Sequence, residues 1–577
     1  MRWPVALFIG LICFARMAPG QSDESNVTVS VFSTHVTHEV TFSPLDSGNV
    51  MRFCPECLQA KIDAPVTLKW SDGQIQMMGG SKGDSLPHKQ LEFRGAFRVR
   101  IEGSSEIESA AGRWIVDKDT NGLRILLTTS AERYVIATLN GEAASDEPLE
   151  SLKAMAVVGR TFALTNAHRH GAEGFDFCDS THCQALRFGS ARPEVEEAVR
   201  ATTGETLWDG TRRAQAYATQ HCGGEAEDAS SVWPTIHAPY LPAHPDPYCL
   251  RRSTALWHAD INIAQLARIL RDQHWNVPEQ IETIRVTKRT STGRVQRLEV
   301  LGQGTSAEIS ASSLHFALDR ALGWNQLRSN WYDITLNNGT AHFDGKGYGH
   351  GVGLCQVGSF EMAAEGRNYR EILNFYFPGT QLRITPMDAG WKETSGAGWT
   401  LVTATPSHDF LQTGNVAWAK SQSVFPPRAP VHPVVRLMPS TELFRQATDQ
   451  PGWMLASTRG TNIILQPLAV LHAHASESST LLHEFLHALV EQEAASQTPL
   501  WLREGLVEVL AGDPHQTGGT MPTPEIEALL AHPSTLPEAQ LAHAASAQLV
   551  QRLIDKYGLQ TVRSWLRSGV PSTALAP

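Results

Sequence analysis

The chain has 577 residues, which is too long for one ordinary domain and predicts about two to four of them. Its composition is that of a soluble globular protein with enough apolar residues to build real cores. The formal net charge of −11 excludes a typical nucleic-acid-binding protein, which would present a basic surface. The charge leaves a carbohydrate ligand open, because sugars are recognised through hydrogen bonds and stacking on aromatic rings.

The N-terminal segment has the layout of a secretory signal peptide. Arg2 is followed by an apolar run over residues 5–14 and then by small residues up to Gly20. This run is too short to span a membrane comfortably, and no later stretch of the sequence is long and apolar enough. We therefore expect residues 1–21 to be a signal peptide and the rest to be exported to the periplasm or cell envelope, with no stable membrane span. An uncleaved anchor is the alternative.

Two periodicities follow each other in the next part of the chain. The β-branched residues in 27–40 and the alternation of apolar and polar residues over 65–140 predict strands and hairpins, and residues 133–142 belong to this strand pattern. Over residues 149–167 the apolar positions recur at helical spacing and predict a helix. Residues 340–385 contain a glycine-rich loop, which a helix and a strand are expected to follow.

The C-terminal part begins after a change in composition. Residues 386–432 are rich in Gly, Ser and Pro and predict a linker. The pattern then restarts with a strand, a helix, a hairpin and a strong helix near 478–494. The expected fold class is α+β multidomain, with a large mixed α/β domain over 22–385 (core 130–385) and a small α+β domain over 433–577.

Four blocks of the large domain carry a recognisable order of motifs. They are ERYVIATLNGEAASDEPLESLKAMAVVGRTFAL (132–164), FDFCDSTHCQ (175–184), AVRATTGETLWDG (198–210) and GKGYGHGVGLCQVGSFEMAAEGRNYREILNFYFPGTQL (345–382). Together they resemble the stage II sporulation protein D family, which has amidase-enhancer relatives. Cys222 and Cys355 stand where that family commonly has Ser.

The resemblance implies a protein that binds peptidoglycan and, like a lytic transglycosylase, cleaves glycan strands lacking stem peptides. The alternative is a non-catalytic peptidoglycan-binding protein that enhances a cell-wall amidase. Non-hydrolytic cleavage needs one carboxyl group, which protonates the glycosidic oxygen and then takes the proton from the sugar's own 6-hydroxyl. The pKa of that group must be raised by burial or by a neighbouring charge. The resemblance marks Glu150 as this residue, with Glu142 as the second candidate, and helix capping is the alternative role of Glu150.

Four further residues are candidate substrate contacts. The loop before Gln356 lacks the strand–turn–helix context of a dinucleotide site, so we interpret it as a tight turn beside a glycan groove. This interpretation places Tyr348, His350 and Gln356 at the groove, although His350 could instead satisfy backbone groups of the loop. Arg160 is either a glycan contact or a structural ion-pair residue.

A first metal site is predicted from His170, Cys178, His182 and Cys183, because thiolate and imidazole ligands suit tetrahedral zinc. The resemblance supports zinc at this position. The alternative is a disulfide between Cys178 and Cys183, which an oxidising compartment would permit. Seven cysteines follow Cys13, so at least one is unpaired or bound to metal. The candidate disulfide pairs elsewhere are Cys222 with Cys249 and Cys54 with Cys57.

A second metal site is predicted in the C-terminal domain from the pattern His483-Glu484-x-x-His487. Positions i and i+4 of a helix share one face, so both imidazoles can bind one zinc ion, with Glu484 beside it as general base. Glu504, within Trp-Leu-Arg-Glu-Gly, resembles the third ligand of gluzincin metallopeptidases, and Glu508 is the reserve candidate. The expected activity is a zinc metallopeptidase, and the alternative is a degenerate domain used as a scaffold.

Overall fold

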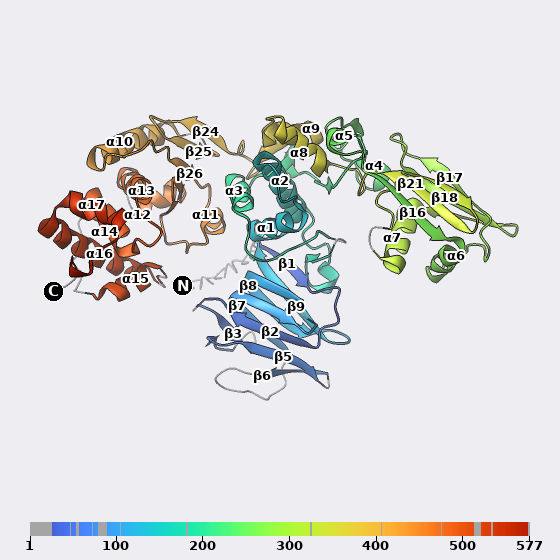
Figure 1. The fold of residues 1–577 in the computed structure, drawn as a ribbon, viewed down its shortest axis with the longest axis horizontal. Coiled ribbons are helices and arrows are strands. Elements are labelled where there is room, and N and C mark those ends of the chain that lie inside the picture. The colour runs from blue at the N-terminus through green and yellow to red at the C-terminus, as the bar shows by residue number, and fades with distance from the viewer. Residues whose placement is uncertain are drawn as a thin grey trace, which may run out of the picture. The chain divides into compact units, whose positions relative to one another are not determined.

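The structure is a computed structural model that describes residues 26–46, 48–53, 57–71, 73–78, 89–103, 105–180, 183–323, 326–405, 407–474, 476–512, 521–531, 533 and 535–574. The chain divides into two compact units, residues 1–134 with 166–190 and residues 135–165 with 191–577. Strands alone form the first part of the described chain, a mixture of helices and separate small sheets follows, and helices alone form the last part (Figure 1), which confirms the α+β multidomain class. The predicted signal peptide, 1–21, lies outside the described residues. Within the described ranges, no helix combines the length and the apolar character that crossing a membrane requires.

The first unit is built on one sheet, drawn in blue in Figure 1, whose main path runs β10-β1-β9-β8-β7-β2-β5-β6. Its apolar residues alternate inward, and Phe42 stacks on Phe93 with ring centroids 4.2 Å apart. The strands predicted in 27–40 are confirmed. The strands are β1 (Asn26–Val31), β2 (Glu39–Pro44), β3 (Val50–Arg52), β4 (Ala60–Lys61), β5 (Val66–Ser71), β6 (Gln74–Met78), β7 (Gln90–Ile101), β8 (Glu106–Lys118), β9 (Leu123–Ser130) and β10 (Phe177–Cys178).

Two helices, α1 (Ala131–Glu142) and α2 (Leu149–Thr165), carry the first sequence block. The helix predicted for 149–167 is confirmed, but the strand predicted for 133–142 is wrong, because this segment lies in α1. Val135 and Leu139, one helical turn apart, are both buried, so the segment presents one apolar face at helical spacing.

The rest of the large domain consists of short elements around a common core, followed by a lobe with two three-stranded sheets, β16-β21-β20 and β17-β18-β19. The core elements are α3 (Pro193–Ala201), β11 (Thr206–Asp209), β12 (Arg212–Arg213), β13 (Ala218–Thr219), β14 (Glu225–Ala226), α4 (Ala229–Val232), β15 (His244–Pro245) and α5 (Cys249–Arg252). The lobe comprises β16 (Leu256–Asn262), α6 (Ile263–Asp272), β17 (Thr283–Arg289), β18 (Val295–Gly302), β19 (Thr305–Ser310), α7 (Ala311–Leu322), β20 (Tyr332–Asn337) and β21 (Thr340–Lys346).

The glycine-rich loop leads from the lobe back into the core, where β22 (Leu354–Cys355), α8 (Gln356–Ala364), α9 (Tyr369–Tyr376) and β23 (Gln381–Arg383) follow. Gly353 has a φ of 75°, and a Cβ atom there would lie 2.2 Å from the carbonyl oxygen of Tyr217. Only glycine fits this close approach. The loop therefore packs closely against Tyr217, the residue before β13. The helix and the strand predicted after the loop are confirmed as α8 and β23.

The C-terminal domain contains a five-stranded sheet in the order β24-β25-β26-β28-β27. Its strands are β24 (Lys392–Ser395), β25 (Thr400–Thr403), β26 (Val434–Leu437), β27 (Ala456–Arg459) and β28 (Asn462–Leu465). Its helices are α10 (His408–Val424), α11 (Thr441–Thr448), α12 (Leu468–His474), α13 (Glu477–Glu491), α14 (Leu500–Ala511), α15 (Thr523–Ala531), α16 (Leu536–Tyr557) and α17 (Leu559–Ser568). The helix expected near 478–494 is confirmed as α13.

The segment predicted as a linker, 386–432, differs from that prediction, because it contributes β24, β25 and α10 to the C-terminal domain. Two of its tryptophans explain the difference. Trp399 and Trp418 are buried, and their rings contact Phe485 of α13 at centroid distances of 5.4 and 5.1 Å. Burial of two such large side chains outweighs the local preference of Gly, Ser and Pro for irregular structure.

Candidate functional sites

Glu142 and Gln356 come together from distant parts of the chain. Glu142 is the last residue of α1, and Gln356 is the first residue of α8. The amide Nε2 of Gln356 donates a hydrogen bond to Oε2 of Glu142 over 3.2 Å, although the residues are 214 positions apart. Both side chains are half-buried. The structure thus joins a predicted catalytic carboxylate to a predicted substrate-binding residue.

The carboxylate of Glu150, in the first turn of α2, is held by two other groups. Lys153 donates to Oε1 over 2.5 Å, and the backbone N–H of Tyr369 donates to Oε2 over 2.8 Å. Tyr369 is the first residue of α9, so Glu150 satisfies one of the N–H groups that a helix start leaves without a partner. This contact supports the capping alternative, although the helix that Glu150 caps is α9 rather than its own.

Glu147 is a third carboxyl group of the same motif, and it is not among the residues predicted from the sequence. Burial raises the pKa of Glu147, while the hydroxyl of Ser151, which donates to Oε1 over 2.5 Å, acts in the opposite direction. The Ser151 hydroxyl also contacts the Ser359 hydroxyl at 2.7 Å. A raised pKa is the property expected of a general acid. The sequence signal was its position between the two candidate glutamates.

Arg160 and Tyr348 are fixed inside the domain. The side chain of Arg160 is fully buried, and its Nη1 donates to the backbone carbonyl of Glu205 over 3.0 Å. A guanidinium without exposed surface cannot reach a glycan, which supports the structural alternative for Arg160. The backbone of Tyr348 forms a reciprocal bridge with His221, with N–H to O distances of 2.7 and 3.0 Å. This bridge anchors the loop, and the Tyr348 side chain is half-buried.

His350 serves the loop itself. Its Nδ1 accepts a hydrogen bond from the backbone N–H of Val352 over 3.0 Å, and its ring packs against Tyr217 and Trp233. Burial, together with the positive charge of Arg294, lowers the pKa of His350 to about 4. The imidazole is therefore neutral at ordinary pH. These contacts favour the role in satisfying loop backbone groups over the role of sugar contact.

The predicted cysteine–histidine site is partly assembled in the first unit. The ligand atoms of His170, Cys178 and Cys183 all lie within 4.8 Å of one another, and neither thiol forms a disulfide bond. The Sγ atoms are 2.8 Å apart, and His170 Nε2 lies 3.4 Å from Cys183 Sγ. His170 Nδ1 contacts the Glu173 carboxylate at 2.8 Å, a partner of the kind that orients metal-binding imidazoles. The types of these donors suit zinc, although the two sulfurs lie closer together than the distance of about 3.8 Å between two thiolates bound to one zinc ion. His182 lies outside the described residues.

The His-Glu-x-x-His residues lie on α13, and Glu504 comes from α14. The Nε2 atoms of His483 and His487 are 3.1 Å apart, and they lie 3.5 and 3.4 Å from the two carboxylate oxygens of Glu504. Two nitrogen or oxygen ligands of one tetrahedral zinc ion stand about 3.3 Å apart, from bond lengths of about 2.0 Å. The three predicted ligands therefore fit one zinc ion. Glu484 is buried, and its Oε2 accepts a hydrogen bond from the Thr458 hydroxyl over 2.5 Å.

His543 of α16 completes this cluster. It could not be predicted from the sequence, because it is a single histidine in an amphipathic helix. Its Nδ1 lies 2.7 Å from Oε1 of Glu508 and 3.0 Å from Oε1 of Glu504. Burial opposes a charged imidazole, but these carboxylates hold the pKa of His543 well above its usual range. Burial also opposes a positive charge on His483. The neighbouring carboxylates, above all Glu504, outweigh burial and raise the pKa of His483 to about 9. Bound zinc would displace such protons.

Comparisons with known proteins relate two segments of the chain to known families. Residues 119–208, which include α1, α2 and Glu142, match the family described as "Stage II sporulation protein". Residues 250–353, which include the two small sheets of the lobe, match a "Domain of unknown function (DUF8618)". The first match bears out the family resemblance of the large domain over these residues.

Three relatives share part of the chain. An uncharacterized protein of Brachyspira hyodysenteriae is 28% identical over 44% of this chain and 66% of its own length. The "Amidase enhancer" of Bacillus subtilis is 24% identical over 41% of this chain and 38% of its own length. The "Stage II sporulation protein D" of Bacillus amyloliquefaciens is 24% identical over 44% of this chain and 73% of its own length. The chain thus spans less than two thirds of the first two relatives.

A solved structure of an M1 zinc metallopeptidase from Deinococcus radiodurans aligns with 42% of this chain and 54% of its own chain. The identity is 15% and the TM-score is 0.19, so this likeness carries no argument about the fold or the chemistry. The zincin-like interpretation of the C-terminal domain therefore rests on the geometry of its own residues.

Proposed function

We propose that this chain is an exported peptidoglycan-binding protein of the cell envelope, with a glycan-cleaving centre at Glu142 and a zinc peptidase centre in the C-terminal domain. The names of the relatives support a role at the cell wall. The contact between Glu142 and Gln356 carries the first assignment, because it brings two motif residues into one site. Glu150 is the weaker candidate, since both of its oxygens are held by Lys153 and by α9.

At the glycan-cleaving centre, the carboxyl group of Glu142 protonates the glycosidic oxygen as the bond breaks. The resulting carboxylate then takes the proton from the 6-hydroxyl of the same sugar, which closes the anhydro ring. One carboxyl group acting in both steps is general acid–base catalysis, which contributes about 10²–10⁴-fold in rate. The amide of Gln356 keeps the carboxylate in one orientation through both steps.

The test uses the purified full-length mature chain and glycan strands stripped of stem peptides. Three matched variants, Glu142→Gln, Glu147→Gln and Glu150→Gln, each remove one negative charge at nearly constant volume. We expect anhydro-ended products, detected by mass spectrometry, from the wild type and from Glu150→Gln, and a loss of at least about 100-fold in Glu142→Gln. A selective loss in Glu147→Gln or Glu150→Gln would move the catalytic role to that residue.

The alternative, a non-catalytic enhancer of a cell-wall amidase, predicts a different outcome. The wild type and all three variants would then bind glycan strands without creating new ends. A purified cell-wall amidase would release more stem peptides from intact peptidoglycan in the presence of this chain than in its absence. This result, with no new glycan ends at any enzyme concentration, would contradict the glycan-cleaving proposal.

The zinc peptidase assignment is carried by the convergence of His483, His487 and Glu504 on one point. Zinc bound there would supply a Lewis acid for a peptide carbonyl. Glu484 would then act as the general base, taking a proton from the attacking water and delivering it to the leaving amine. The Thr458 hydroxyl orients Glu484, and Thr458 lies on β27, one of the two edge strands of the five-stranded sheet. An extended peptide can add to such an edge as a further strand, which places its backbone beside Glu484.

The peptidase centre is tested with Glu484→Gln and His487→Ala in the full chain. We expect Glu484→Gln to keep its zinc and to lose peptide cleavage, and His487→Ala to lose one zinc equivalent. Stem-peptide libraries and envelope proteins are the substrates to screen, with glycan cleavage measured in parallel. A scaffold would show wild-type and Glu484→Gln proteins that are equally inactive on every peptide.

We also propose zinc at His170, Cys178 and Cys183, with a structural role. His170 directly precedes the turn at residues 171–173, Cys178 lies on β10, and Cys183 follows β10, so an ion there would fasten these flanking segments to β10 and the first unit's sheet. Cys183→Ser should lower the zinc content of the full chain by one equivalent. A disulfide between Cys178 and Cys183 in the protein purified with zinc would contradict this assignment.

A further inference from the structure

A third group of donors is buried in the second unit and belongs to none of the sites above. It consists of three thiols and one carboxylate, from Cys222, Asp246, Cys249 and Cys355. All four residues are fully buried, and one ligand atom from each lies within 4.8 Å of the other three. Four donors from three segments of the chain thus surround one point in the protein interior.

The separations between these donors match those of ligands sharing one metal ion. Cys222 Sγ lies 3.4 Å from Cys249 Sγ and 3.1 Å from Asp246 Oδ2. Two thiolates bound to one tetrahedral zinc ion stand about 3.8 Å apart, because each zinc–sulfur bond is about 2.3 Å. A disulfide bond would require about 2.05 Å. All three cysteines are free thiols.

A disulfide would also explain only part of the cluster. Pairing two of the cysteines would leave the third thiol buried beside the carboxylate of Asp246. In the part of the chain that the structure describes, no Lys, Arg or His side chain forms an ion pair with Asp246. A buried carboxylate without a positive partner is costly, whereas a divalent cation would compensate it together with the thiolates.

The surroundings of Asp246 hold its carboxylate in place. The backbone N–H groups of Tyr248 and Cys249 donate to Oδ1 over 3.0 and 3.3 Å, and the Tyr376 hydroxyl donates to Oδ2 over 2.9 Å. Gly358 makes room for this arrangement, since a Cβ atom there would lie 2.1 Å from the Tyr376 hydroxyl. Metal-binding carboxylates are usually oriented by such outer hydrogen bonds.

The sulfur of Cys355 accepts hydrogen bonds from two backbone N–H groups. The N–H of Cys222 lies 3.3 Å and the N–H of Gly358 lies 3.5 Å from Cys355 Sγ. These two N–H groups hold the sulfur of Cys355 in a fixed position.

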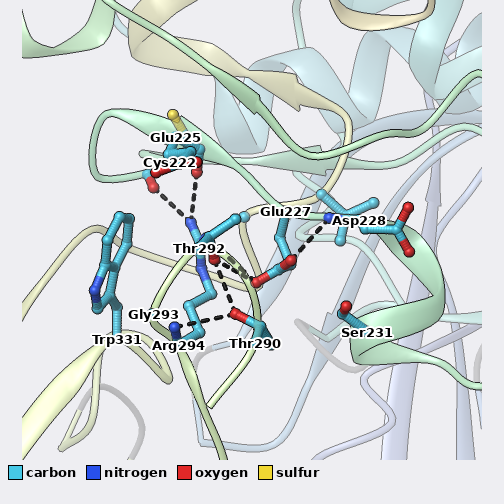
Figure 2. Close-up of polar contacts among 12 residues, drawn as sticks. Cys222, Glu225, Glu227, Asp228, Ser231, Thr290, Thr292, Gly293, Arg294 and Trp331 are labelled. Atoms are coloured by element: carbon cyan, nitrogen blue, oxygen red, sulfur yellow. Dashed lines mark hydrogen bonds and ion pairs between the residues drawn. The ribbon is translucent and has the colours of Figure 1, made fainter.

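Arg294 fixes the backbone of Cys222 so that its sulfur faces the cluster. Figure 2 shows the carbonyl oxygen of Cys222 turned toward the guanidinium and the sulfur pointing away from it. Arg294 Nη2 donates to the carbonyl oxygens of Cys222 and Glu225 over 2.5 and 2.9 Å, and Nη1 lies 3.6 Å from the buried Glu227 carboxylate. The Trp331 ring covers the guanidinium at 4.6 Å.

We propose that Cys222, Asp246, Cys249 and Cys355 bind one structural zinc ion. Three thiolates and a carboxylate are suitable zinc donors, and four protein ligands close the coordination shell. The complete burial leaves no position for a substrate, which excludes a catalytic role. Binding releases the three thiol protons and needs no oxidant. The ion connects the segment after β13, the start of α5 and the end of β22, where Cys355 directly precedes Gln356.

The test leaves the buried cluster intact and removes the other two candidate zinc sites. We would purify the full chain carrying Cys178→Ser, Cys183→Ser, His483→Ala and His487→Ala from zinc-containing medium and count zinc by plasma mass spectrometry. The expected result is one zinc equivalent per chain. Adding Cys249→Ser should remove it. A fourfold variant without zinc overturns the proposal, and this count does not depend on whether the Cys249→Ser protein folds.

Two further measurements use the same fourfold variant. Replacement of zinc by Co²⁺ should produce an intense sulfur-to-cobalt charge-transfer band, because the remaining site is rich in thiolates. Its absence from a cobalt-loaded protein overturns the assignment of the ligands. Digestion under non-reducing conditions should yield Cys222, Cys249 and Cys355 as thiols. A disulfide among them in the zinc-grown protein also overturns the proposal.

Discussion

Gln356 donates a hydrogen bond to Glu142 over 3.2 Å and so joins the start of α8 to the end of α1. The contact gives Glu142 a defined orientation at the point where the family motif of α1 and the glycine-rich loop meet. In our proposal, Gln356 is therefore a positioning residue for the carboxyl group that cuts the glycan.

Replacing Gln356 by Ala should slow glycan cleavage more than it weakens binding. We expect kcat to fall about 10-fold or more, because the carboxylate loses its orienting partner, and KM to change little. Steady-state kinetics on denuded glycan strands measure both constants. A rise in KM with an unchanged kcat would show instead that Gln356 contacts the substrate.

Replacing Glu150 by Ala should affect stability rather than chemistry. The variant removes the acceptor for the first N–H of α9 and the ion pair with Lys153, at a cost of about 1–2 kcal/mol in the free energy of unfolding. Hydrogen exchange of peptides from α9 reports the loosening. Cleavage per folded molecule should remain within about threefold of the wild type, and a larger fall would return Glu150 to the catalytic role.

His543 should control the affinity of the C-terminal zinc site without being one of its ligands. Its imidazole contacts Glu504 and Glu508, so His543→Gln frees the Glu504 carboxylate to rotate. Loss of such an outer partner costs about 10–100-fold in metal affinity. Competition with a chelator of known affinity measures the change. If His543→Gln abolished zinc binding as completely as His487→Ala, His543 would be a ligand itself.

His350 should make the second unit sensitive to acid. Its folded-state pKa is about 4, below the value of about 6.5 for an unfolded chain. As pH falls from 6.5 to 4, the unfolded chain binds the proton first, so stability is intact above 6.5 and is lost progressively down to 4. The loss is on the order of 3 kcal/mol, since one pKa unit corresponds to about 1.4 kcal/mol.

Urea unfolding at several pH values, followed by tryptophan fluorescence, measures this dependence. His350→Gln should reduce the slope of unfolding free energy against pH by about one proton between pH 4 and 6.5. His237→Gln is the matched control, because His237 is exposed on the same domain. Equal slopes in the wild type and in His350→Gln would contradict the assignment.

Trp399 should be essential to the C-terminal domain, although it lies in the segment predicted as a linker. Its ring is fully buried, and its Nε1 donates to Asn415 over 3.0 Å. Trp399→Ala should lower the free energy of unfolding by about 3–5 kcal/mol. Val416→Ala, at a position 67% exposed on α10, should change stability by less than about 0.5 kcal/mol. Proteolysis within α13 at increasing urea concentrations compares the stabilities of the two variants. If Trp399→Ala and Val416→Ala resisted proteolysis equally, residues 386–432 would be a linker after all.

The local sequence determined the elements whose side-chain period and motif are unambiguous. The helical spacing over 149–167 predicted α2, and His483 and His487, four residues apart, had to share one face of α13. The prediction of a strand over 133–142 was wrong, because the pattern of apolar residues in a short segment does not distinguish a strand from a buried helix. The prediction of a linker over 386–432 was wrong, because Gly, Ser and Pro content predicts irregular structure locally but does not predict the burial of Trp399 and Trp418.

The sequence by itself therefore determined the motifs, the metal-binding residue types and the α+β class, since these depend on neighbours within one or two turns of chain. Only the tertiary structure decided which distant residues meet. The tertiary structure brings Gln356 into hydrogen-bonding contact with Glu142 and His543 into contact with the Glu504 carboxylate, and it gathers three cysteines around Asp246. Such encounters depend on how whole elements pack, and no local pattern of residues encodes the distance between them.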